Sequence, residues 1–278
     1  MTIQDRQPVL INGVSVAAAD AGVSVFDIGF QRGYGCFEAM RSYQGVPFRM
    51  QRHLERLENS ARNLRIDVGS LEVIAAWCMQ VAGHGDGVVR VFVTGGTDMH
   101  HPGADNSVIV FLDPVPKMPD VFSLDVIEAP WHADGKSSEL TGAKTLSYGP
   151  NLAATISARS RGFDDAALVG STGTVLEGPT FSLGWVAGST IYTPSLDANI
   201  LASVTREAVL EVAASLGIES IEGSFGLDEL LGADEVFVLS TVREVSSVVR
   251  VGETSYPPGS VTARLRSGFH DLVAAETK

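Results

Sequence analysis

The stretch DPVPKMP, residues 113–119, divides this chain into two parts. Its three prolines each fix φ and remove a backbone donor, so the segment is stiff and extended. On both sides of it, strand-like runs alternate with amphipathic helical patterns. The sequence therefore predicts an α+β protein with a small N-terminal domain at residues 1–113, a linker at 114–120 and a larger domain at 121–278. A long surface loop within one domain is the alternative reading of the proline-rich stretch.

The part before the linker combines hairpins and helices. Residues 37–43 and 46–50 flank Gln44-Gly45, a pattern typical of a hairpin. Apolar residues recur at spacings of three and four over residues 54–64 and predict a helix. The other elements expected here are a strand at 9–11 before the turn pair Asn12-Gly13, a helix from about 70 to 81, and strands at 88–94 and 107–112.

The part after the linker predicts a helix from Pro150 to about Arg161 and another from about Val204 to Leu216, which ends before Gly217. Residues 166–169 and 174–176 are expected to form a hairpin around a Ser-Thr-Gly turn. The remaining strands are expected at 181–187, 190–192, 235–239 and 246–251.

Composition excludes several classes of function. The net charge is −13 and the sequence shows no uniform basic stripe, so nucleic acid is not an expected partner. No apolar run approaches the roughly 20 residues of a membrane span, and residues 1–12 lack the pattern of a signal peptide. The two cysteines do not form a disulfide framework. A soluble cytoplasmic enzyme or binding protein is expected.

Three short motifs are rejected on their spacing. Residues 135–137 read GKS, but Pro130 occupies the position of the glycine that a phosphate-binding loop requires. Gly33 and Gly35 begin a dinucleotide-like pattern, but Glu38 replaces its third glycine. The adjacent pair His100-His101 lacks the ligand spacing of a zinc site, so we expect no metal.

Lys144 lies in the stretch TGAKTLSY, residues 141–148, among small and apolar residues just before a predicted helix. Such surroundings favour the neutral amine, which is the nucleophilic form. The other lysines, Lys117, Lys136 and Lys278, lie in the linker, in a polar loop and at the C-terminus. Lys144 is therefore the candidate for covalent catalysis by an amine. A surface lysine at a strand end is the alternative.

Glu177 ends an apolar strand and precedes Gly178-Pro179. A carboxylate in such a place needs a cation or a hydrogen-bond donor, and a protonated pyridine nitrogen would serve. A solvent-facing strand end is the alternative.

An anion site is expected where the helix from Val204 begins. Residues 200–206 bring small residues and hydroxyls to a helix N-terminus, where free N–H groups attract a phosphate. Arg56, in HLERL at residues 53–57, and Ser240-Thr241 could add donors. An ordinary helix cap and a solvated arginine are the alternatives.

Taken in order, these residues resemble the fold-type IV pyridoxal phosphate enzymes, or class IV aminotransferase family. This group holds branched-chain and D-amino-acid aminotransferases and aminodeoxychorismate lyase. The resemblance covers nearly the whole chain. Its segments are ING at 11–13, GCFE at 35–38, HLERL at 53–57, the Lys144 stretch, GTVLE at 173–177, TP at 193–194, LASVTR at 201–206 and ADEVF at 233–237.

The resemblance implies pyridoxal 5'-phosphate as the cofactor, held by the larger domain. Lys144 would bind it covalently and then move the proton at the substrate carbon, and Glu177 would bind its ring nitrogen. Tyr148 would reach the ring oxygen, although its spacing from Lys144 differs from the branched-chain pattern. Ser182 stands where many relatives carry asparagine. The phosphate would be held by Arg56, Val204, Thr205 and Thr241.

The reaction implied is transfer of an amino group between an amino acid, with a branched-chain-like L-amino acid favoured, and a 2-oxo acid. Residues 37–41, FEAMR, resemble the branched-chain enzymes. The lyase, which forms 4-aminobenzoate and pyruvate, uses a hydroxyl residue at the position of Ala39. However, residues 143–148 and 177–179 also resemble some lyases. The lyase, a D-amino-acid or (R)-amine transaminase and a non-catalytic cofactor-binding protein remain the alternatives.

The substrate is expected to contact Phe37, Arg90, Val242 and Arg243, with the side chains of Arg32 and Arg41 as alternative partners of its carboxylate. The D-amino-acid enzymes place an arginine directly after a threonine like Thr94, but Gly95 stands at that position here. This disfavours a carboxylate-binding site of the D-specific type. The loop at residues 95–105 resembles one that reaches the neighbouring subunit. The resemblance therefore implies a homodimer.

Overall fold

The computed structural model describes residues 6–278, and these form two compact units. The first unit contains the described residues up to 116 together with Ala143–Tyr148 and Glu276–Lys278. The second contains Lys117–Gly142 and Gly149–Ala275. The segment that carries Lys144 thus belongs to the first unit, whereas the sequence had placed all of residues 121–278 in one domain. Residues 1–5, part of the start expected not to be a signal peptide, lie outside the described residues.

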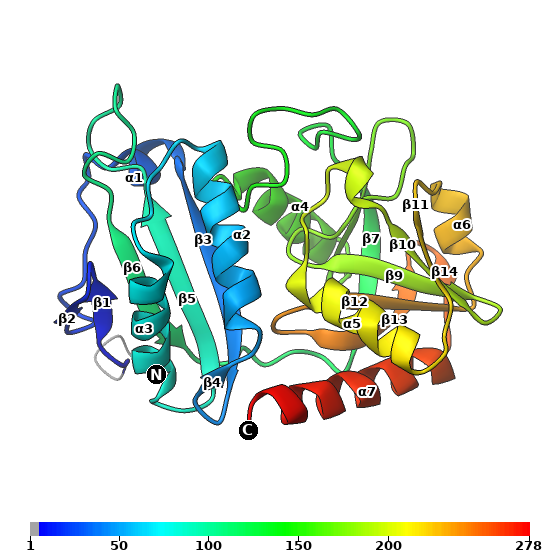
Figure 1. Cartoon of the computed structure of the whole chain (residues 1–278). Helices are drawn as coiled ribbons and strands as arrows, with labels where there is room; N and C mark the ends of the chain where they lie inside the picture. The colour runs from blue at the N-terminus through cyan, green and yellow to red at the C-terminus, as the bar shows by residue number, and fades with distance from the viewer. Residues whose placement is uncertain (1–5) are drawn as a thin grey trace. The chain divides into compact units, whose positions relative to one another are not determined.

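The first unit is built on a six-stranded sheet of order β2-β1-β6-β5-β3-β4. All of its strand pairs are antiparallel. The helices α2 and α3 lie on one face of this sheet (Figure 1). The elements are β1 (Val9–Ile11), β2 (Val14–Val16), α1 (Ile28–Arg32), β3 (Gly35–Tyr43), β4 (Val46–Pro47), α2 (Met50–Asn63), α3 (Leu71–Ala82), β5 (Gly87–Thr94) and β6 (Val108–Asp113).

Turn chemistry explains both hairpins of this unit. Asn12-Gly13 joins β1 to β2, and Gln44-Gly45 joins β3 to β4, with positive φ at all four residues. This is the geometry of the tight two-residue turns that suit twisted strands. Both predicted hairpin turns are confirmed. Met50, expected at the end of a strand, instead begins α2.

The core of the first unit lies between the sheet and its two long helices. Leu54 and Leu57 of α2 and Ile74 of α3 are buried against Met40 of β3 and Val91 of β5. The opposite face of the sheet carries the alternate side chains of the same strands. A row of three phenylalanines crosses it, with stacked ring pairs Phe37–Phe92 and Phe92–Phe111.

The second unit is built on an eight-stranded mixed sheet, with seven strands in the order β11-β10-β9-β12-β13-β7-β8 and β14 paired to β13. The pairs β7–β8, β7–β13 and β10–β11 are parallel. The elements are β7 (Val121–Glu128), α4 (Gly149–Ser160), β8 (Asp165–Val169), β9 (Ser182–Ala187), β10 (Thr190–Pro194), η2 (Leu196–Ala198), α5 (Val204–Ser215), β11 (Ser220–Gly223), α6 (Leu227–Leu231), β12 (Glu235–Ser240), β13 (Glu244–Val251), β14 (Thr254–Ser255) and α7 (Ser260–Glu276).

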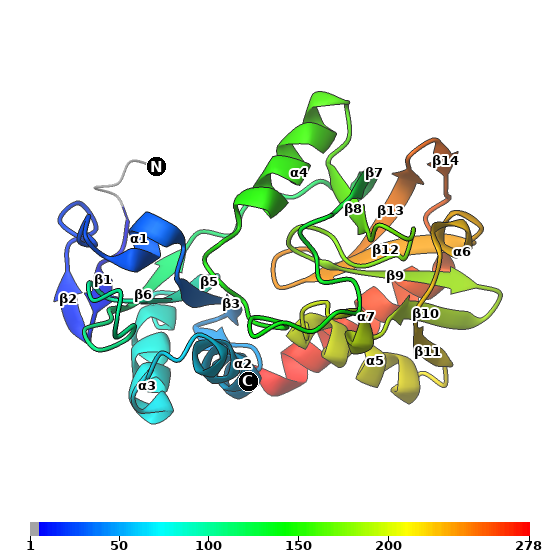
Figure 2. The same ribbon diagram turned by 90° about the horizontal axis from the view of Figure 1, so that it is seen from above.

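Helices lie on both sides of this sheet (Figure 2). The helix α4 packs Ala154 and Ala158 against the β8 residues Ala166 and Leu168. On the other side α5 and α7 contact each other, and the main chain at Gly268 approaches Val212 closely. The predicted helices over residues 150–161 and 204–216 are confirmed.

Six elements of the second unit were not expected from sequence: β7, η2, β11, α6, β14 and α7. The strand β7 follows the proline-rich stretch directly, and α7 forms the end of the chain. The start of α7 is fixed by the buried Glu235, whose carboxylate accepts hydrogen bonds from the N–H groups of Val261 and Thr262. Residues 174–176 pair antiparallel with β8, as the predicted hairpin requires: the Leu176 N–H donates to the Leu168 carbonyl at 3.0 Å, and Val175 bridges Val169. Within residues 6–278, no helix has the length and apolar character needed to cross a bilayer.

Candidate active site

The segment with Lys144 lies along the edge of β3 in the first unit. The Phe37 N–H donates to the Lys144 carbonyl at 3.0 Å, and the Leu146 N–H donates to the Gly35 carbonyl at 2.9 Å. Cys36 and Thr145 form the bridge between these bonds. The segment therefore continues the sheet at one end of β3, while β4 pairs with the other end. These main-chain hydrogen bonds therefore fix the position of the Lys144 backbone, from which its side chain extends.

Gly35, at the start of β3, and Gly33, two residues before it, allow the Lys144 segment to lie this close to the strand. A Cβ at Gly35 would lie 2.4 Å from the Val93 carbonyl oxygen and 2.7 Å from a methyl group of Leu146. Gly33 has φ +65°, and a Cβ there would lie 2.7 Å from Ser147 Oγ. Side chains at these positions would collide with the strand or with the Lys144 segment. The glycines rejected above as a dinucleotide motif therefore have a packing role.

Ser60 of α2 holds the Lys144 backbone from the other side. Its Oγ accepts a hydrogen bond from the Lys144 N–H at 3.0 Å and donates one to the Arg56 carbonyl at 2.8 Å. Ser60 is almost fully buried. The sequence analysis did not identify this residue. The only signal was its spacing of four from Arg56, which places both on one face of the helix.

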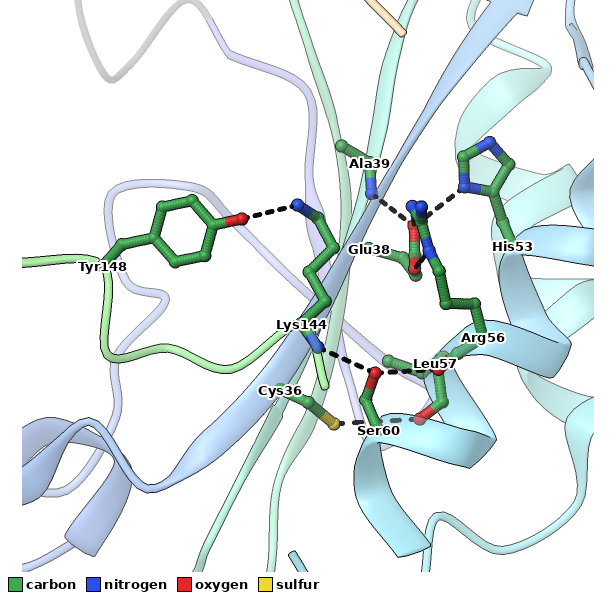
Figure 3. Close-up of polar contacts among 9 residues, drawn as sticks. All are labelled: Cys36, Glu38, Ala39, His53, Arg56, Leu57, Ser60, Lys144 and Tyr148. Carbon is green, nitrogen blue, oxygen red and sulfur yellow. Dashed lines mark hydrogen bonds and ion pairs between the residues drawn. The ribbon is translucent and has the colours of Figure 1, made fainter. Parts of the chain in front are cut away.

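The Lys144 amine lies near two aromatic rings, those of Phe37 and Tyr148, and Figure 3 shows its contact with Tyr148. Nζ donates a hydrogen bond to Tyr148 Oη at 2.9 Å and lies 4.4 Å from the centre of the Phe37 ring. The Phe37 and Tyr148 rings meet edge to face at 5.1 Å. All three side chains are half-buried. A phenol and a primary amine in direct contact can exchange a proton and can fix the amine's orientation.

Arg56 is anchored by Glu38 (Figure 3). Its Nε and one Nη donate to the two oxygens of the fully buried Glu38 carboxylate at 2.6 and 2.8 Å. His53 Nδ1 contacts the same carboxylate at 2.8 Å. The bidentate contact of Arg56 is thus made with Glu38, so a phosphate would have to contact a different part of the guanidinium.

This cluster shifts two pKa values. Burial raises the pKa of Glu38, but the charge and hydrogen bonds of Arg56, together with those of His53, outweigh burial and hold it far below its usual value. Burial lowers the pKa of His53, and the hydrogen bond and charge of Glu38 oppose this only in part. Near neutral pH the cluster therefore holds an ionised carboxylate, a guanidinium and a neutral imidazole.

Two arginines share the face of the sheet on which Phe37 lies. Arg90 is opposite Ala39 in the strand register, and its Nε contacts Asp113 at 3.4 Å. Arg41 lies four residues beyond Phe37, on the same face of β3. Its guanidinium lies 5.0 Å from the Tyr43 ring, and its Nε and one Nη are buried with no acceptor among residues 6–278. A buried, unmatched guanidinium is costly unless an anion meets it.

Glu177, in the second unit, is held by donors on both carboxylate oxygens. His132 Nε2 lies 3.3 Å from Oε1, and the Leu201 N–H donates to Oε2 at 3.2 Å. The Glu177 side chain is 15% exposed. Its main-chain carbonyl accepts the Leu168 N–H of β8 at 2.9 Å. His132 was assigned no chemistry from sequence, because an isolated histidine carries no spacing signal.

The start of α5 fits the predicted anion site within the second unit. Ser203 is the N-cap, and its Oγ accepts the Arg206 N–H at 3.2 Å. The next two residues, Val204 and Thr205, are buried. Their N–H groups lie in the first turn of the helix, where no intrahelical acceptor exists. Thr241 and Val242 lie in the turn that joins β12 to β13.

Arg243, which the sequence predicted to contact the substrate, has partners inside the second unit. Its guanidinium donates to Asp165 at 2.6 Å and to Thr180 at 2.8 Å, and it lies 4.6 Å from the Phe181 ring. Its N–H donates to Ser240 Oγ at 3.1 Å. The Arg243 side chain and main-chain N–H therefore have partners inside the second unit, whereas its Nε is buried with no acceptor among residues 6–278. A contact of Arg243 with the substrate stays a prediction.

The histidine pair of the 95–105 loop is exposed. His101 contacts Asp98 at 2.8 Å, three residues before it. Among the described residues, no group of three or more histidine, cysteine, aspartate or glutamate side chains is placed to hold a metal ion.

Comparison with known proteins identifies the family. A family model described as amino-transferase class IV matches residues 35–251. The chain is 31% identical to a putative branched-chain-amino-acid aminotransferase of Methanocaldococcus jannaschii, over 95% of this chain and 96% of that protein. It is 30% identical to the aminodeoxychorismate lyase of Bacillus subtilis, over 97% of this chain and 94% of that protein.

A solved structure agrees with the sequence comparison. The branched-chain aminotransferase of the archaeon Thermoproteus uzoniensis, crystallised with norvaline, matches with a TM-score of 0.88 and 26% identity. The match covers 98% of this chain and 96% of that one. The fold is that of the fold-type IV transaminases, as the sequence predicted. The chain belongs to the class IV aminotransferase family.

Proposed function

We propose that this protein transfers an amino group between an amino acid and a 2-oxo acid with pyridoxal 5'-phosphate as cofactor. A branched-chain-like L-amino acid is the favoured donor. The observation that carries the proposal is the placement of Lys144, whose backbone is fixed on a strand edge while its amine contacts a phenol. The chain is a class IV aminotransferase. Among the lysines of residues 6–278, Lys144 is the one whose side chain is not exposed.

Each unit, taken by itself, carries residues whose chemistry suits this cofactor. Lys144 would hold it covalently, Tyr148 would contact its ring oxygen, and Glu177 would bind its ring nitrogen. The first N–H groups of α5, on Val204 and Thr205, with Thr241 and the outer edge of Arg56, would hold the phosphate. When bound, pyridoxal phosphate supplies an electron-withdrawing ring that stabilises negative charge on the substrate carbon.

The chain's own residues supply proton transfer and orientation. In the proposed reaction the Lys144 amine would move the proton from the substrate's α-carbon to the cofactor carbon that receives the amino group. Tyr148 holds that amine in place through its 2.9 Å hydrogen bond. The Phe37 ring covers the amine on another side, which limits the access of water.

We propose Arg41 as the main partner of the substrate carboxylate, supported by Arg90 and by the Val242 N–H. Arg41 has two buried donor atoms without an acceptor among residues 6–278, whereas Arg90 already contacts Asp113. Phe37 would contact the substrate's apolar part. The pairing favours amino acids over amines without a carboxylate, and so disfavours the (R)-amine transaminase alternative.

Removal of the Lys144 amine tests the proposal. Purified protein loaded with pyridoxal phosphate is mixed with L-leucine, L-isoleucine or D-alanine, and the cofactor's absorbance is followed before 2-oxoglutarate is added. We expect an L-amino acid to convert the cofactor to its amine form, and this conversion to be about 100- to 10,000-fold slower in Lys144→Ala, which lacks the positioned proton-transfer group. Lys136→Ala, a change in an exposed loop, is the control and should behave as wild type.

The lyase is the second candidate function, and the similarity to the Bacillus subtilis lyase supports it. Ala39 disfavours it, because a methyl group cannot assist bond cleavage as a hydroxyl can. Aminodeoxychorismate without any 2-oxo acid separates the two reactions. Release of pyruvate would favour the lyase. Bound cofactor that responds to no amine would favour a non-catalytic binding protein.

We also propose a homodimer. Phe26 and Phe30, in and next to α1, are 70% and 72% exposed. On α4, Leu152 and Ile156 are each 59% exposed and lie one turn apart. Large apolar side chains at such exposure mark protein interfaces when they gather.

A further inference from the structure

The loop after β7 places a histidine against Glu177. The Ala129 N–H donates to the Val169 carbonyl at 2.8 Å, which extends the pairing of β7 with β8. The chain then turns, and the His132 N–H donates to the Ala129 carbonyl at 2.9 Å. These bonds lie within the second unit and fix the position from which the imidazole extends. The ring is 12% exposed.

The contacts of the imidazole define which nitrogen carries the proton. The Asp134 N–H donates to Nδ1 at 3.4 Å, so Nδ1 is an acceptor. In a neutral imidazole the proton then sits on Nε2. Nε2 lies 3.3 Å from Glu177 Oε1 and donates to it. The imidazole thus links a main-chain donor to the carboxylate.

The Asp134 main chain is itself held in place. The Asp134 side chain packs against the backbone at Gly170, where a Cβ would lie 2.2 Å from its carboxylate. Thr172 Oγ1 contacts the same carboxylate at 3.5 Å. The Asp134 backbone has φ +43°, a conformation that asparagine and aspartate tolerate better than most residues. The orientation of the histidine is therefore set by two neighbouring segments.

Each carboxylate oxygen of Glu177 has one N–H donor, from His132 and from Leu201. Two donors on different oxygens fix the plane of the carboxylate. Each donor also occupies a lone pair of the carboxylate that a proton would otherwise take. A carboxylate that binds a protonated ring nitrogen must remain the weaker base, because a stronger base would take the proton from the ring.

We propose that His132 is a positioning residue that keeps the shared proton on the ring nitrogen of the cofactor rather than on Glu177. The inference rests on the proposed function, in which Glu177 binds that nitrogen. The ring is an effective electron sink only while its nitrogen is protonated. His132 thus acts on the reaction through Glu177 and without touching the substrate.

The first test uses the protein without cofactor. Long-range proton–nitrogen correlation spectra of histidine-labelled protein report which ring nitrogen of His132 carries hydrogen, and His132→Gln assigns the signal. We expect the Nε2–H form. An Nδ1–H form would overturn the proposal, because that imidazole could not donate to Glu177. This result does not depend on whether the protein binds pyridoxal phosphate.

The second test uses pyridoxal phosphate labelled with nitrogen-15 in its ring, bound to the wild type and to three variants. In the wild type and in His132→Gln, which keeps an N–H donor at similar reach, we expect the chemical shift of a protonated ring. In His132→Leu the signal should move toward that of the unprotonated ring. His84→Leu, an exposed histidine of the first unit, should match the wild type.

An unchanged ring shift in folded His132→Leu would refute the role of His132. If His132→Leu does not fold, the tautomer of His132 in the wild-type protein decides whether His132 donates to Glu177. If the wild type does not bind the cofactor, the proposed function fails, and the tautomer measurement still decides whether His132 donates to Glu177.

Discussion

Among the site residues that the sequence did not predict, Ser60 makes the most direct contact with the Lys144 backbone. Its hydroxyl is the acceptor for the Lys144 N–H, and Ser60→Ala would leave that donor without its partner. An unmatched buried N–H costs about 1–3 kcal/mol. We expect Ser60→Ala to speed hydrogen exchange at the Lys144 amide and to slow amino transfer. Exchange as slow as in the wild type would contradict this, and Ser157→Ala on the exposed face of α4 is a control.

The Glu38–His53–Arg56 cluster predicts how stability depends on pH. Both shifted groups have folded pKa values below their ordinary values of 4.5 and 6.5. The unfolded chain therefore binds protons more readily, and stability is lost as pH falls. The contribution of His53 is complete above about pH 6.5 and declines below it. That of Glu38 is complete above about pH 4.5 and declines further into acid.

Denaturant unfolding at a series of pH values measures this dependence. His53→Gln should flatten the decline that begins near pH 6.5, the ordinary pKa of a histidine. Glu38→Gln should lower stability at neutral pH by about 3–5 kcal/mol, because it leaves the Arg56 charge buried without its partner. Equal pH profiles for the wild type and His53→Gln would contradict the assignment.

Residue-scale prediction from sequence succeeded where a side chain's role follows from its neighbours in the chain. Lys144 was selected because its flanking residues are small and apolar, and Tyr148 lies only four residues away. Glu38, as the partner of Arg56, comes from another element, and its contact depends on how β3 and α2 pack. The contact of Arg243 with Asp165 could not be predicted, because sequence does not tell which way a guanidinium points.

At the scale of elements, Gly35 controls how closely β3 approaches its neighbours. A methyl group there would meet the Val93 carbonyl oxygen at 2.4 Å. We expect Gly35→Ala to destabilise the protein by at least about 1–3 kcal/mol, the range for overpacked sites. Gly22→Ala, where a Cβ meets nothing within 4 Å, should leave the melting temperature near that of the wild type. Equal melting temperatures for both variants would contradict the packing argument.

The helix α7 depends on a carboxylate from β12. Glu235 accepts the N–H groups of Val261 and Thr262 and the Thr262 hydroxyl at 2.8–3.0 Å. Loss of a helix cap costs about 0.5–2 kcal/mol, and a buried site adds to this. We expect Glu235→Gln to lower the free energy of unfolding by about 1–3 kcal/mol and the exposed control Glu128→Gln to change it little. An unchanged value for Glu235→Gln would contradict the capping role.

Element prediction worked for periodic segments and failed for those defined by distant contacts. The helix around Leu54 and Leu57 repeats its apolar residues clearly, and its core partners confirm it. In contrast, α7 begins where Glu235 caps it, some 25 residues away in sequence. Thr174 likewise bridges Gly226, far along the chain, whereas Val175 bridges Val169 as the predicted hairpin requires.

At the scale of the whole molecule, the proposed homodimer predicts the mass of the protein in solution. Light scattering coupled to gel filtration should give about twice the chain mass of 29.4 kDa. Phe30→Glu together with Ile156→Glu should shift the mass toward the monomer, because a charge opposes burial of these exposed positions. A monomeric wild type would contradict the proposal.

The covalent role of Lys144 is the central claim. Borohydride reduction of protein loaded with pyridoxal phosphate, followed by digestion and mass spectrometry, locates the lysine that carries the cofactor. The account predicts a phosphopyridoxyl group on the peptide with Lys144 and none on the peptides with Lys117, Lys136 or Lys278. Modification of one of these other lysines instead, or of no lysine, would contradict it.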